Sequence, residues 1–372
     1  MKSSQPVTSS NTSTPGSGSR TPAEWAPHES TWLAWPHFRG DWPGKFDPIP
    51  WVYAEIIRNL ARHERVDLIV NNAESEKRAR KTLKLANALS KNIRFHRWPT
   101  NRVWTRDSGC TFVCGAGTPD RESKRSSATL QAIKWRFNAW AKYPNYRRDE
   151  KIGSLMAKAA HAEGVRAQHR DIRVVLEGGS IDVNGEGTLL TTEECLLSKI
   201  QQRNPGFRRQ DYEQVFATYL GIRKVIWLGR GIAGDDTHGH VDDITRFVAL
   251  DTVVTMIESN PKDKNYAPLL ENLERLKTAT DQDGKRLRVV ELPMPAPVVF
   301  EGRRLPASYG NFYIANGVVL VPVFNDPNDR IALNILAALF PDREIVPIYS
   351  GDLIWGFGAL HCMTQQQPRT SR

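Results

Sequence analysis

Hydrophobic positions along this chain switch between the spacing of helices and the spacing of strands. Val52, Ile56 and Leu60 recur at helical spacing and predict a helix over residues 50–63. The apolar run that follows predicts a strand over residues 66–70. Helical and strand patterns alternate in this way to the C-terminus, which indicates an α/β protein.

The other predicted elements keep the same rhythm of hairpin, helix and strand. Asn-Gly pairs are typical of hairpin turns, and the pair at 316–317 predicts a hairpin over residues 311–324. Residues 172–183 are predicted to form two strands that bend at a Gly-Gly pair. Further helices are predicted over residues 74–89, 211–220, 269–276 and 329–340, and further strands over residues 93–95, 225–228, 245–257 and 344–349.

Composition indicates how the chain is organised. Residues 1–20 are rich in Ser, Thr, Pro and Gly and lack the apolar segment of a secretory signal, so we interpret them as a disordered tail. No linker of Pro, Gly and Ser interrupts residues 21–372, which favours a single domain there. No apolar run approaches the roughly 20 residues that span a bilayer. The four cysteines form no framework, so we expect a cytoplasmic protein with reduced thiols and no membrane partner.

The net charge of +10 raises a second class of function, a basic module that binds nucleic acid or acidic partners. Basic residues cluster in three runs, at 77–84, 121–148 and 203–209. No zinc finger, RNA-binding aromatic signature or basic zipper accompanies them. We therefore interpret the runs as solvated surface and expect no nucleic acid partner.

A thiol near the C-terminus is the first candidate for chemistry. Cys362 follows Gly356 and Gly358, which permit a tight backbone approach. A thiolate is nucleophilic near neutral pH once its pKa is lowered, whereas a buried structural cysteine is inert. His361 lies next to the thiol, but neighbouring side chains on a strand point to opposite faces, so we do not assign it as the base.

A histidine and a carboxylate lie two positions apart in the segment 235–243. If a strand begins at Gly239, His240 and Asp242 project to the same face. A histidine beside a carboxylate can both donate and accept a proton. The alternative is an Asp-rich surface turn in which His238 and His240 are loop residues or metal ligands, although no partner pair at ligand spacing occurs elsewhere.

Two further carboxylates extend the candidate set. Glu177 lies between an apolar run and two glycines, and a buried carboxylate there needs a positive partner, either Arg106 or a cationic substrate. Asp107 is either a turn residue or a second acidic group, and Trp104 before it offers a flat face to a cation. A guanidinium is a planar fork of N–H donors that carboxylates bind in pairs, so these residues favour attack on a guanidinium.

Several ordered motifs together resemble the agmatine deiminase family, in the wider group that includes bacterial peptidylarginine deiminases. The similarity runs from about Pro22 to Gln367, nearly the whole chain beyond the tail. The motifs that carry it lie at residues 22–36, 176–180, 187–196, 235–243, 308–313 and 361–366.

The resemblance implies a pentein fold, an α/β propeller of five pseudo-symmetric repeats around a central active site. It implies an enzyme without metal or cofactor, with Cys362 as nucleophile and His240 as general acid and base. Asp107 and Asp242 would clamp the guanidinium, and Glu177 would assist its nitrogens. The substrate-binding residues would be Trp104, Asp236 and Gly358.

The resemblance also implies a reaction. The thiol would add to the guanidinium, ammonia would leave, and water would release a ureido product from a covalent thiouronium intermediate, so that agmatine yields N-carbamoylputrescine. Residues 356–360 read Gly-Phe-Gly-Ala-Leu where many family members carry three glycines and an asparagine. Peptidyl arginine or another guanidine therefore stays an alternative substrate, and amidino transfer an alternative reaction. The expected partner is a small guanidine, and a homo-oligomer is left open.

Overall fold

The computed structural model describes residues 19–115 and 129–370. Most of the predicted tail, residues 1–18, lies outside these ranges, as does the start of the basic run at 121–148. Within them the strands form small separate sheets, and no sheet closes on itself. The chain is a mixed α/β protein, as its hydrophobic pattern predicts.

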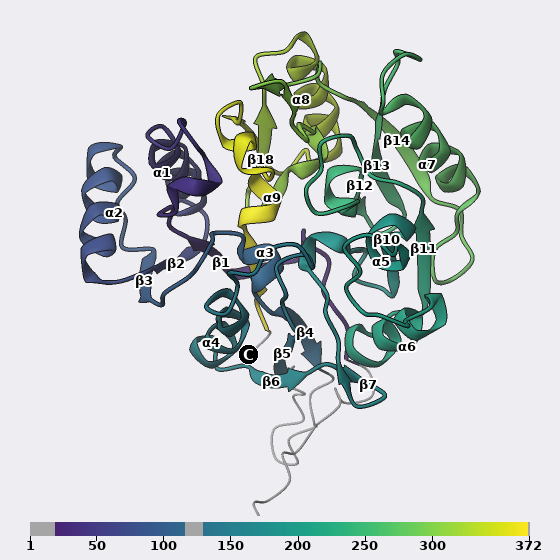
Figure 1. The fold of residues 1–372 in the computed structure, drawn as a ribbon, viewed down its shortest axis with the longest axis horizontal. Helices are drawn as coiled ribbons and strands as arrows, with labels where there is room; N and C mark the ends of the chain where they lie inside the picture. Colours follow the sequence, from purple (N-terminus) through teal and green to yellow (C-terminus); the bar gives the residue numbers. More distant parts are fainter. Residues whose placement is uncertain (1–18, 116–128, 371–372) are drawn as a thin grey trace, which may run out of the picture.

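Five of the sheets in the described ranges have three or four strands and share one arrangement (Figure 1). In each of them one edge strand is antiparallel to its neighbour and the remaining strands are parallel. The sheets are β20 (Gln365–Pro368), β1 (His28–Ala34), β2 (Arg65–Val70) and β3 (Ile93–Arg97); β4 (Thr111–Gly115), β5 (Thr129–Lys134) and β6 (Glu163–Arg166); β9 (Asp182–Val183), β10 (Thr188–Thr192) and β11 (Lys224–Leu228); β12 (Thr245–Ala249), β13 (Thr252–Ile257) and β14 (Arg288–Pro293); and β17 (Tyr313–Ala315), β18 (Val318–Val323) and β19 (Glu344–Tyr349).

Helices join the parallel strands, because a parallel pair needs a crossover longer than a hairpin turn. Figure 1 shows these crossover helices on the outside of the molecule, whereas the short helices α3 (Thr105–Ser108) and α9 (Leu360–Met363) lie near its centre. The crossover helices are α1 (Ile49–Leu60), α2 (Ala73–Leu85), α4 (Ile152–Ala159), α6 (Arg209–Leu220), α7 (Tyr266–Thr278) and α8 (Pro327–Leu339).

Two helix ends show the capping chemistry expected from the sequence. α6 ends at Gly221, whose φ of +71° is the left-handed conformation that glycine adopts without strain. α8 begins after Asp326, whose side chain accepts a hydrogen bond from the Asn328 backbone N–H, and Asp329 completes a capping box. The helices predicted over residues 211–220 and 329–340 are confirmed to within two residues.

The predicted hairpin around the Asn-Gly pair at 316–317 is also confirmed, with β17 and β18 paired antiparallel. The prediction for residues 172–183 is wrong in its details. The strands there, β8 (Ile172–Arg173) and β9, have only two residues each, and a 3-10 helix, η3 (Gly178–Ser180), stands at the glycine pair. The reason is tertiary, because the Gly179 N–H donates to the Asp107 side chain instead of to a neighbouring strand.

The largest hydrophobic cluster joins the two ends of the described chain. It extends in sequence from Trp32 to Met363. β20 pairs antiparallel with β1, with Gln365 opposite Trp32, so the segment that carries Cys362 is held against the first sheet. Among the described residues, we find no helix with the length and apolar character needed to span a membrane.

Candidate active site

Cys362 lies in the short central helix α9, not in a strand as the sequence suggested. The backbone before it is crowded. A Cβ at Gly358 would lie 2.7 Å from Cζ3 of Trp104 and 3.1 Å from Cβ of Cys362. Glycine at this position therefore lets the Trp104 ring and the thiol pack against one turn of backbone.

A cavity of about 240 Å³ reaches the thiol. Its wall includes Cys362, Trp104 and Asp107, together with further aromatic side chains and the charged side chains of Asp41, Arg102, Asp236 and Arg303. The aromatic lining residues are Phe38, Trp140, Tyr143, Trp355 and Phe357. A flat apolar wall with a carboxylate and a thiol at one end fits a planar cation on an aliphatic chain.

Asp107, in α3, is held from two sides. Its Oδ1 accepts a hydrogen bond from the Gly179 N–H at 3.0 Å, and its Oδ2 accepts one from Nε1 of Trp140 at 2.8 Å. Burial raises the pKa of Asp107 to about 6, and repulsion from Asp242 and Glu177 adds to this, against the attraction of His240.

His240 is fully buried directly before a 3-10 helix, η4 (Val241–Asp243), so the strand on which His240 and Asp242 would share a face does not form. Its Nδ1 lies 4.0 Å from Oδ2 of Asp107, and its Nε2 lies 3.8 Å from Oε2 of Glu177. Neither nitrogen has a hydrogen-bond partner among the described residues. Burial alone would lower the pKa of His240, but Asp107, Cys195 and Glu177 raise it well above its ordinary value.

Glu177 has a positive partner that the sequence did not indicate. Nε of Arg203 lies 3.2 and 3.3 Å from its two carboxylate oxygens, and both side chains are completely buried. Burial would raise the pKa of Glu177, but the Arg203 charge and His240 lower it overall. Two interpretations are thereby wrong: Arg106 is not the partner of Glu177, and Arg203 does not belong to a solvated basic surface.

Asp242 presents its two oxygens to different surroundings. Its Oδ2 bonds to Nδ1 of His361 at 2.7 Å and lies 3.6 Å from Sγ of Cys362. Its Oδ1 is buried and has no hydrogen-bond partner in the described ranges. Burial would raise the pKa of Asp242, but the hydrogen bond and charge of His361 lower it overall, so this carboxylate is ionised.

The thiol of Cys362 is surrounded by acidic groups. Burial, followed by Asp242, Asp243 and Asp107, raises its pKa well above the ordinary value. Nδ2 of Asn311 lies 3.1 Å from the sulfur and stabilises its charged form. Without a cation beside it the thiol is therefore protonated, and a bound cation would favour the thiolate.

Gly179 marks the point at which the separate segments meet. A Cβ at this glycine would lie 2.6 Å from Nδ1 of His240, 2.9 Å from Oδ2 of Asp242 and 3.1 Å from Oδ1 of Asp107. The structure thus brings together three segments that are far apart in sequence. His240, Asp242 and Glu177 lie behind the cavity wall, whereas Asp107 and Cys362 form part of it.

Asp236 lies in the cavity wall, but its oxygens already have partners. Its Oδ1 bonds to Nζ of Lys142, and its Oδ2 accepts a hydrogen bond from Tyr143 at 2.6 Å. Nη2 of Arg303, at the rim of the cavity, lies 3.4 Å from Oδ1 of Asp236. The same guanidinium stacks on Phe357, with its central carbon 4.0 Å from the centre of the ring. Basic groups and Phe357 therefore shape the outer part of the cavity.

Sequence reasoning missed several residues that support this site. Asn311 holds the thiol, Trp140 holds Asp107, and Arg203 holds Glu177. Asn311 could have been found, because it lies within the motif at 308–313. No local signal singled out Trp140 or Arg203.

Glu177, Cys195 and His240 could also hold a metal, since their donor atoms lie within 4.8 Å of one another. A carboxylate, a thiolate and an imidazole form a ligand set that zinc accepts. However, the Arg203 guanidinium lies against both oxygens of Glu177, which disfavours a second positive charge there.

The sequence and the fold match a known class of protein. A family model described as Porphyromonas-type peptidyl-arginine deiminase matches residues 20–368. The chain belongs to this family.

Individual relatives cover nearly the whole chain. Agmatine deiminases of Pseudomonas fluorescens and Pseudomonas aeruginosa are 35% and 34% identical to it, over 94% and 96% of this chain and 96% and 98% of their own lengths. The structure of the agmatine deiminase of Enterococcus faecalis is similar with a TM-score of 0.84 and 30% identity, covering 95% of this chain and 96% of that one. An agmatine deiminase of C. jejuni gives a TM-score of 0.80 and 28% identity, with 96% and 99% covered.

Proposed function

We propose that this protein is an agmatine deiminase, which hydrolyses the guanidinium of agmatine to N-carbamoylputrescine and ammonia. The observation that carries the proposal is the convergence of Cys362, His240 and three carboxylates beside one aromatic cavity. Relatives called agmatine deiminase that match over nearly their full lengths support the choice of substrate.

Binding begins with the planar cation. We infer that the guanidinium enters past Trp104 and that Asp107 and Asp242 receive its N–H groups, with the unpartnered Oδ1 of Asp242 as one acceptor. Glu177 assists from behind His240. The arriving positive charge lowers the pKa of the Cys362 thiol, which releases its proton to solvent as the cation binds.

The covalent steps then use one thiolate and one imidazole. The Cys362 thiolate adds to the guanidinium carbon, and the C–N bond breaks as His240, whose raised pKa keeps it protonated, gives a proton to the departing ammonia. The product of this half is a thiouronium on Cys362. Neutral His240 then takes a proton from water, and the hydroxide adds to the same carbon. The C–S bond breaks as the hydroxyl proton of the adduct passes to the leaving sulfur, which releases the neutral ureido product and restores the thiol.

We also infer that the five similar sheets are pseudo-repeats arranged around this site. The support is their shared order of one antiparallel edge strand and a parallel pair joined by a crossover helix. A single domain over residues 21–372, a cytoplasmic location, a homo-oligomer and the lack of a nucleic acid partner remain predictions.

The first prediction concerns the nucleophile and the acid-base group. Cys362→Ala should abolish release of ammonia from agmatine, because no covalent adduct can form. His240→Ala should lower turnover by about 100- to 10,000-fold, since that is the usual contribution of positioned proton transfer. Cys114→Ala is the matched control, a half-buried thiol outside the cavity, and should keep full activity. Full activity of Cys362→Ala would reject the mechanism.

The substrate is tested by the same assay. Purified protein is given agmatine, free arginine and a blocked arginine peptide, and ammonia release is measured for each. We expect agmatine to give the highest kcat/KM. Preference for the peptide would instead support the second candidate, deimination of peptidyl arginine, which the family description and the altered segment at 356–360 favour. Product identification separates hydrolysis from amidino transfer to an amine.

A further inference from the structure

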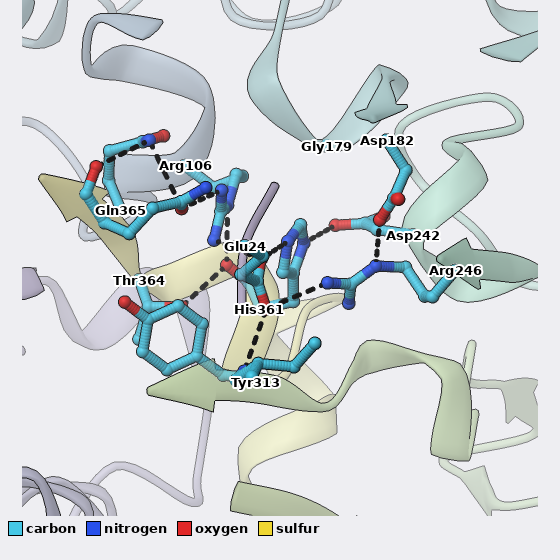
Figure 2. Close-up of polar contacts among 12 residues, drawn as sticks. Glu24, Arg106, Gly179, Asp182, Asp242, Arg246, Tyr313, His361, Thr364 and Gln365 are labelled. Carbon is cyan, nitrogen blue, oxygen red and sulfur yellow. Dashed lines mark hydrogen bonds and ion pairs between the residues drawn. The ribbon is translucent and has the colours of Figure 1, made fainter. Parts of the chain in front are cut away.

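His361, the residue before the nucleophile, lies between two buried carboxylates. Its Nδ1 is 2.7 Å from Oδ2 of Asp242, and its Nε2 is 2.8 Å from Oε2 of Glu24. Figure 2 shows the imidazole with one ring nitrogen directed at each acid. All three side chains are buried, so solvent does not weaken these contacts.

Glu24, at the far end of this chain of contacts, belongs to the segment before β1. Its Oε1 accepts a hydrogen bond from the Ile314 N–H at 2.8 Å and lies 2.9 Å from a guanidinium nitrogen of Arg246. Arg106, the neighbour of Asp107, is 3.3 Å from its Oε2. Figure 2 shows these groups gathered around one carboxylate. Burial would raise the pKa of Glu24, but Arg246, His361 and Arg106 lower it well below the ordinary value.

A carboxylate oxygen has no proton to donate when ionised, so each of these two contacts uses an N–H of the imidazole. Each ring nitrogen of the imidazole thus faces one carboxylate. Its bond to Oδ2 of Asp242 leaves Oδ1 as the oxygen without a partner in the described ranges. The neighbour of the nucleophile thus decides which oxygen of Asp242 is left without a partner.

We propose that Glu24 and His361 are positioning residues that hold Asp242 ionised and oriented, so that its Oδ1 receives an N–H of the substrate guanidinium. This proposal rests on the proposed function of the site. His361 acts through Asp242 and takes no part in proton transfer to the substrate. Glu24 acts through His361 and ties it to the segments that carry Asp107 and Asn311.

Other charged groups bear on the same carboxylate and must be counted when pH is varied. The titratable and charged side chains around the Glu24–His361–Asp242 chain are Arg106, Asp107, Asp182, His240, Asp243, Arg246 and Cys362. Variants of His361 retain all of these side chains, so a difference between two His361 variants in the acidic limb of the pH profile reports on the contact that each variant loses.

The second prediction compares two replacements of His361 that retain different donors. His361→Asn keeps an N–H near the Nδ1 position and can still hold Asp242, whereas His361→Gln keeps one near Nε2 and cannot. We expect His361→Gln to lower kcat/KM for agmatine by about 10- to 100-fold, the usual range for outer partners of site residues. The kcat/KM of His361→Asn should be about ten times higher than that of His361→Gln, because the asparagine keeps a hydrogen bond to the charged carboxylate of Asp242.

The pH profile adds a readout that a merely structural role would not change. Loss of the His361 contact raises the pKa of Asp242, so the acidic limb of kcat/KM for His361→Gln should move to higher pH and become steeper. Glu24→Gln should give a shift in the same direction and a loss of about tenfold. Asp67→Asn is the matched control, since Asp67 is a buried carboxylate that bonds Nε2 of His96 at 2.7 Å and Nε of Arg65 at 2.9 Å away from the site. It should leave activity and the acidic limb unchanged.

The proposal is overturned if folded His361→Gln and His361→Asn have equal kcat/KM and equal acidic limbs. It is also overturned if Glu24→Gln has the same kcat/KM and the same acidic limb as Asp67→Asn. If His361→Gln does not fold, Glu24→Gln is combined with Cys362→Ser and agmatine binding is measured by calorimetry. We expect binding about tenfold weaker than to Cys362→Ser alone, and unchanged binding contradicts the proposal. Failure of the proposed function looks different, because the unmodified protein would then release no ammonia from any guanidine tested.

Discussion

At the scale of single residues, the carboxylates of the site are all buried, but their pKa values are shifted in different directions. Asp107 has a raised pKa, whereas the pKa values of Asp242 and Glu177 are lowered. The difference lies in their partners: His361 bonds Asp242 directly and Arg203 lies against Glu177, but Asp107 receives only neutral N–H donors. One member of the proposed guanidinium clamp is therefore easily protonated and the other is not.

The third prediction follows from the pKa of Asp107, which is about 6 in the free protein. Below that pH the carboxyl gains a proton and no longer attracts the cation, so kcat/KM for agmatine should fall by a further factor of about ten per pH unit, in addition to the dependence that proton release from Cys362 imposes. Trp140→Phe removes a hydrogen bond that favours the charged form, so its acidic limb should lie at higher pH. The measurement is kcat/KM from about pH 4.5 to about pH 8, a range that brackets the pKa of Asp107.

The control for this pH experiment is Trp135→Phe. Trp135 is a buried indole whose Nε1 donates to the hydroxyl of Thr111 at 2.9 Å, away from the carboxylates. The Trp135→Phe variant should show the same acidic limb of kcat/KM as the unmodified protein. An unshifted limb in Trp140→Phe would show that Asp107 does not set it.

At the scale of elements, the regular and irregular parts of the chain have different tasks. The crossover helices and the strands are regular elements, whereas the site residues lie on short turns: α3, η3, η4 and α9. Asp107, Asp242 and Cys362 lie within such turns, and His240 lies directly before one. Short turns free backbone N–H groups for side chains, as the bond from Gly179 to Asp107 shows.

The fourth prediction tests a cap remote from the site. Asp326→Ala should lower the free energy of unfolding by about 1 kcal/mol, because the first turn of α8 loses its side-chain acceptor. Asp342→Ala, at an exposed loop position, should change it little. Urea unfolding of both variants measures the difference, and kcat/KM should stay unchanged in both. Equal unfolding free energies would show that the cap contributes nothing to stability.

At the scale of the whole molecule, the two ends of the described chain depend on each other. β20 completes the first sheet beside β1, and Thr105 donates to the Met363 carbonyl at 2.6 Å. Arg106 donates to Gln366 at 2.6 Å. The segment that carries the nucleophile is thus fixed by its neighbours on both sides, although it stands almost at the end of the sequence.

The fifth prediction removes this attachment. Deletion of residues 365–372 eliminates β20 and the contact to Arg106, so we expect loss of ammonia release together with a lower midpoint of thermal unfolding. Deletion of residues 371–372 alone leaves every β20 pair in place and should keep activity. Retained turnover in the longer deletion would show that α9 is positioned without the strand.

Five of the six crossover helices in the described ranges and the hairpin at 316–317 could be predicted from the sequence, because their periods and turns are local. Gly221 and Asp326 act within a few residues of themselves, and the Asn-Gly turn at 316–317 does the same. The turns around the site could not be predicted in this way. His240 and Cys362 were expected in or near strands and instead lie at short helical turns, whose hydrogen bonds go to side chains from other segments.

The sequence by itself determined which chemical groups are present and the local elements between them. It supplied a thiol, an imidazole and the carboxylates, in an order that resembles one family. Only the tertiary structure decided the partners: Arg203 for Glu177, Trp140 for Asp107, and Asn311 for Cys362. The physical reason is that a buried charge is stabilised by whatever group the fold places within a few ångströms, and separation along the chain carries no information about that distance.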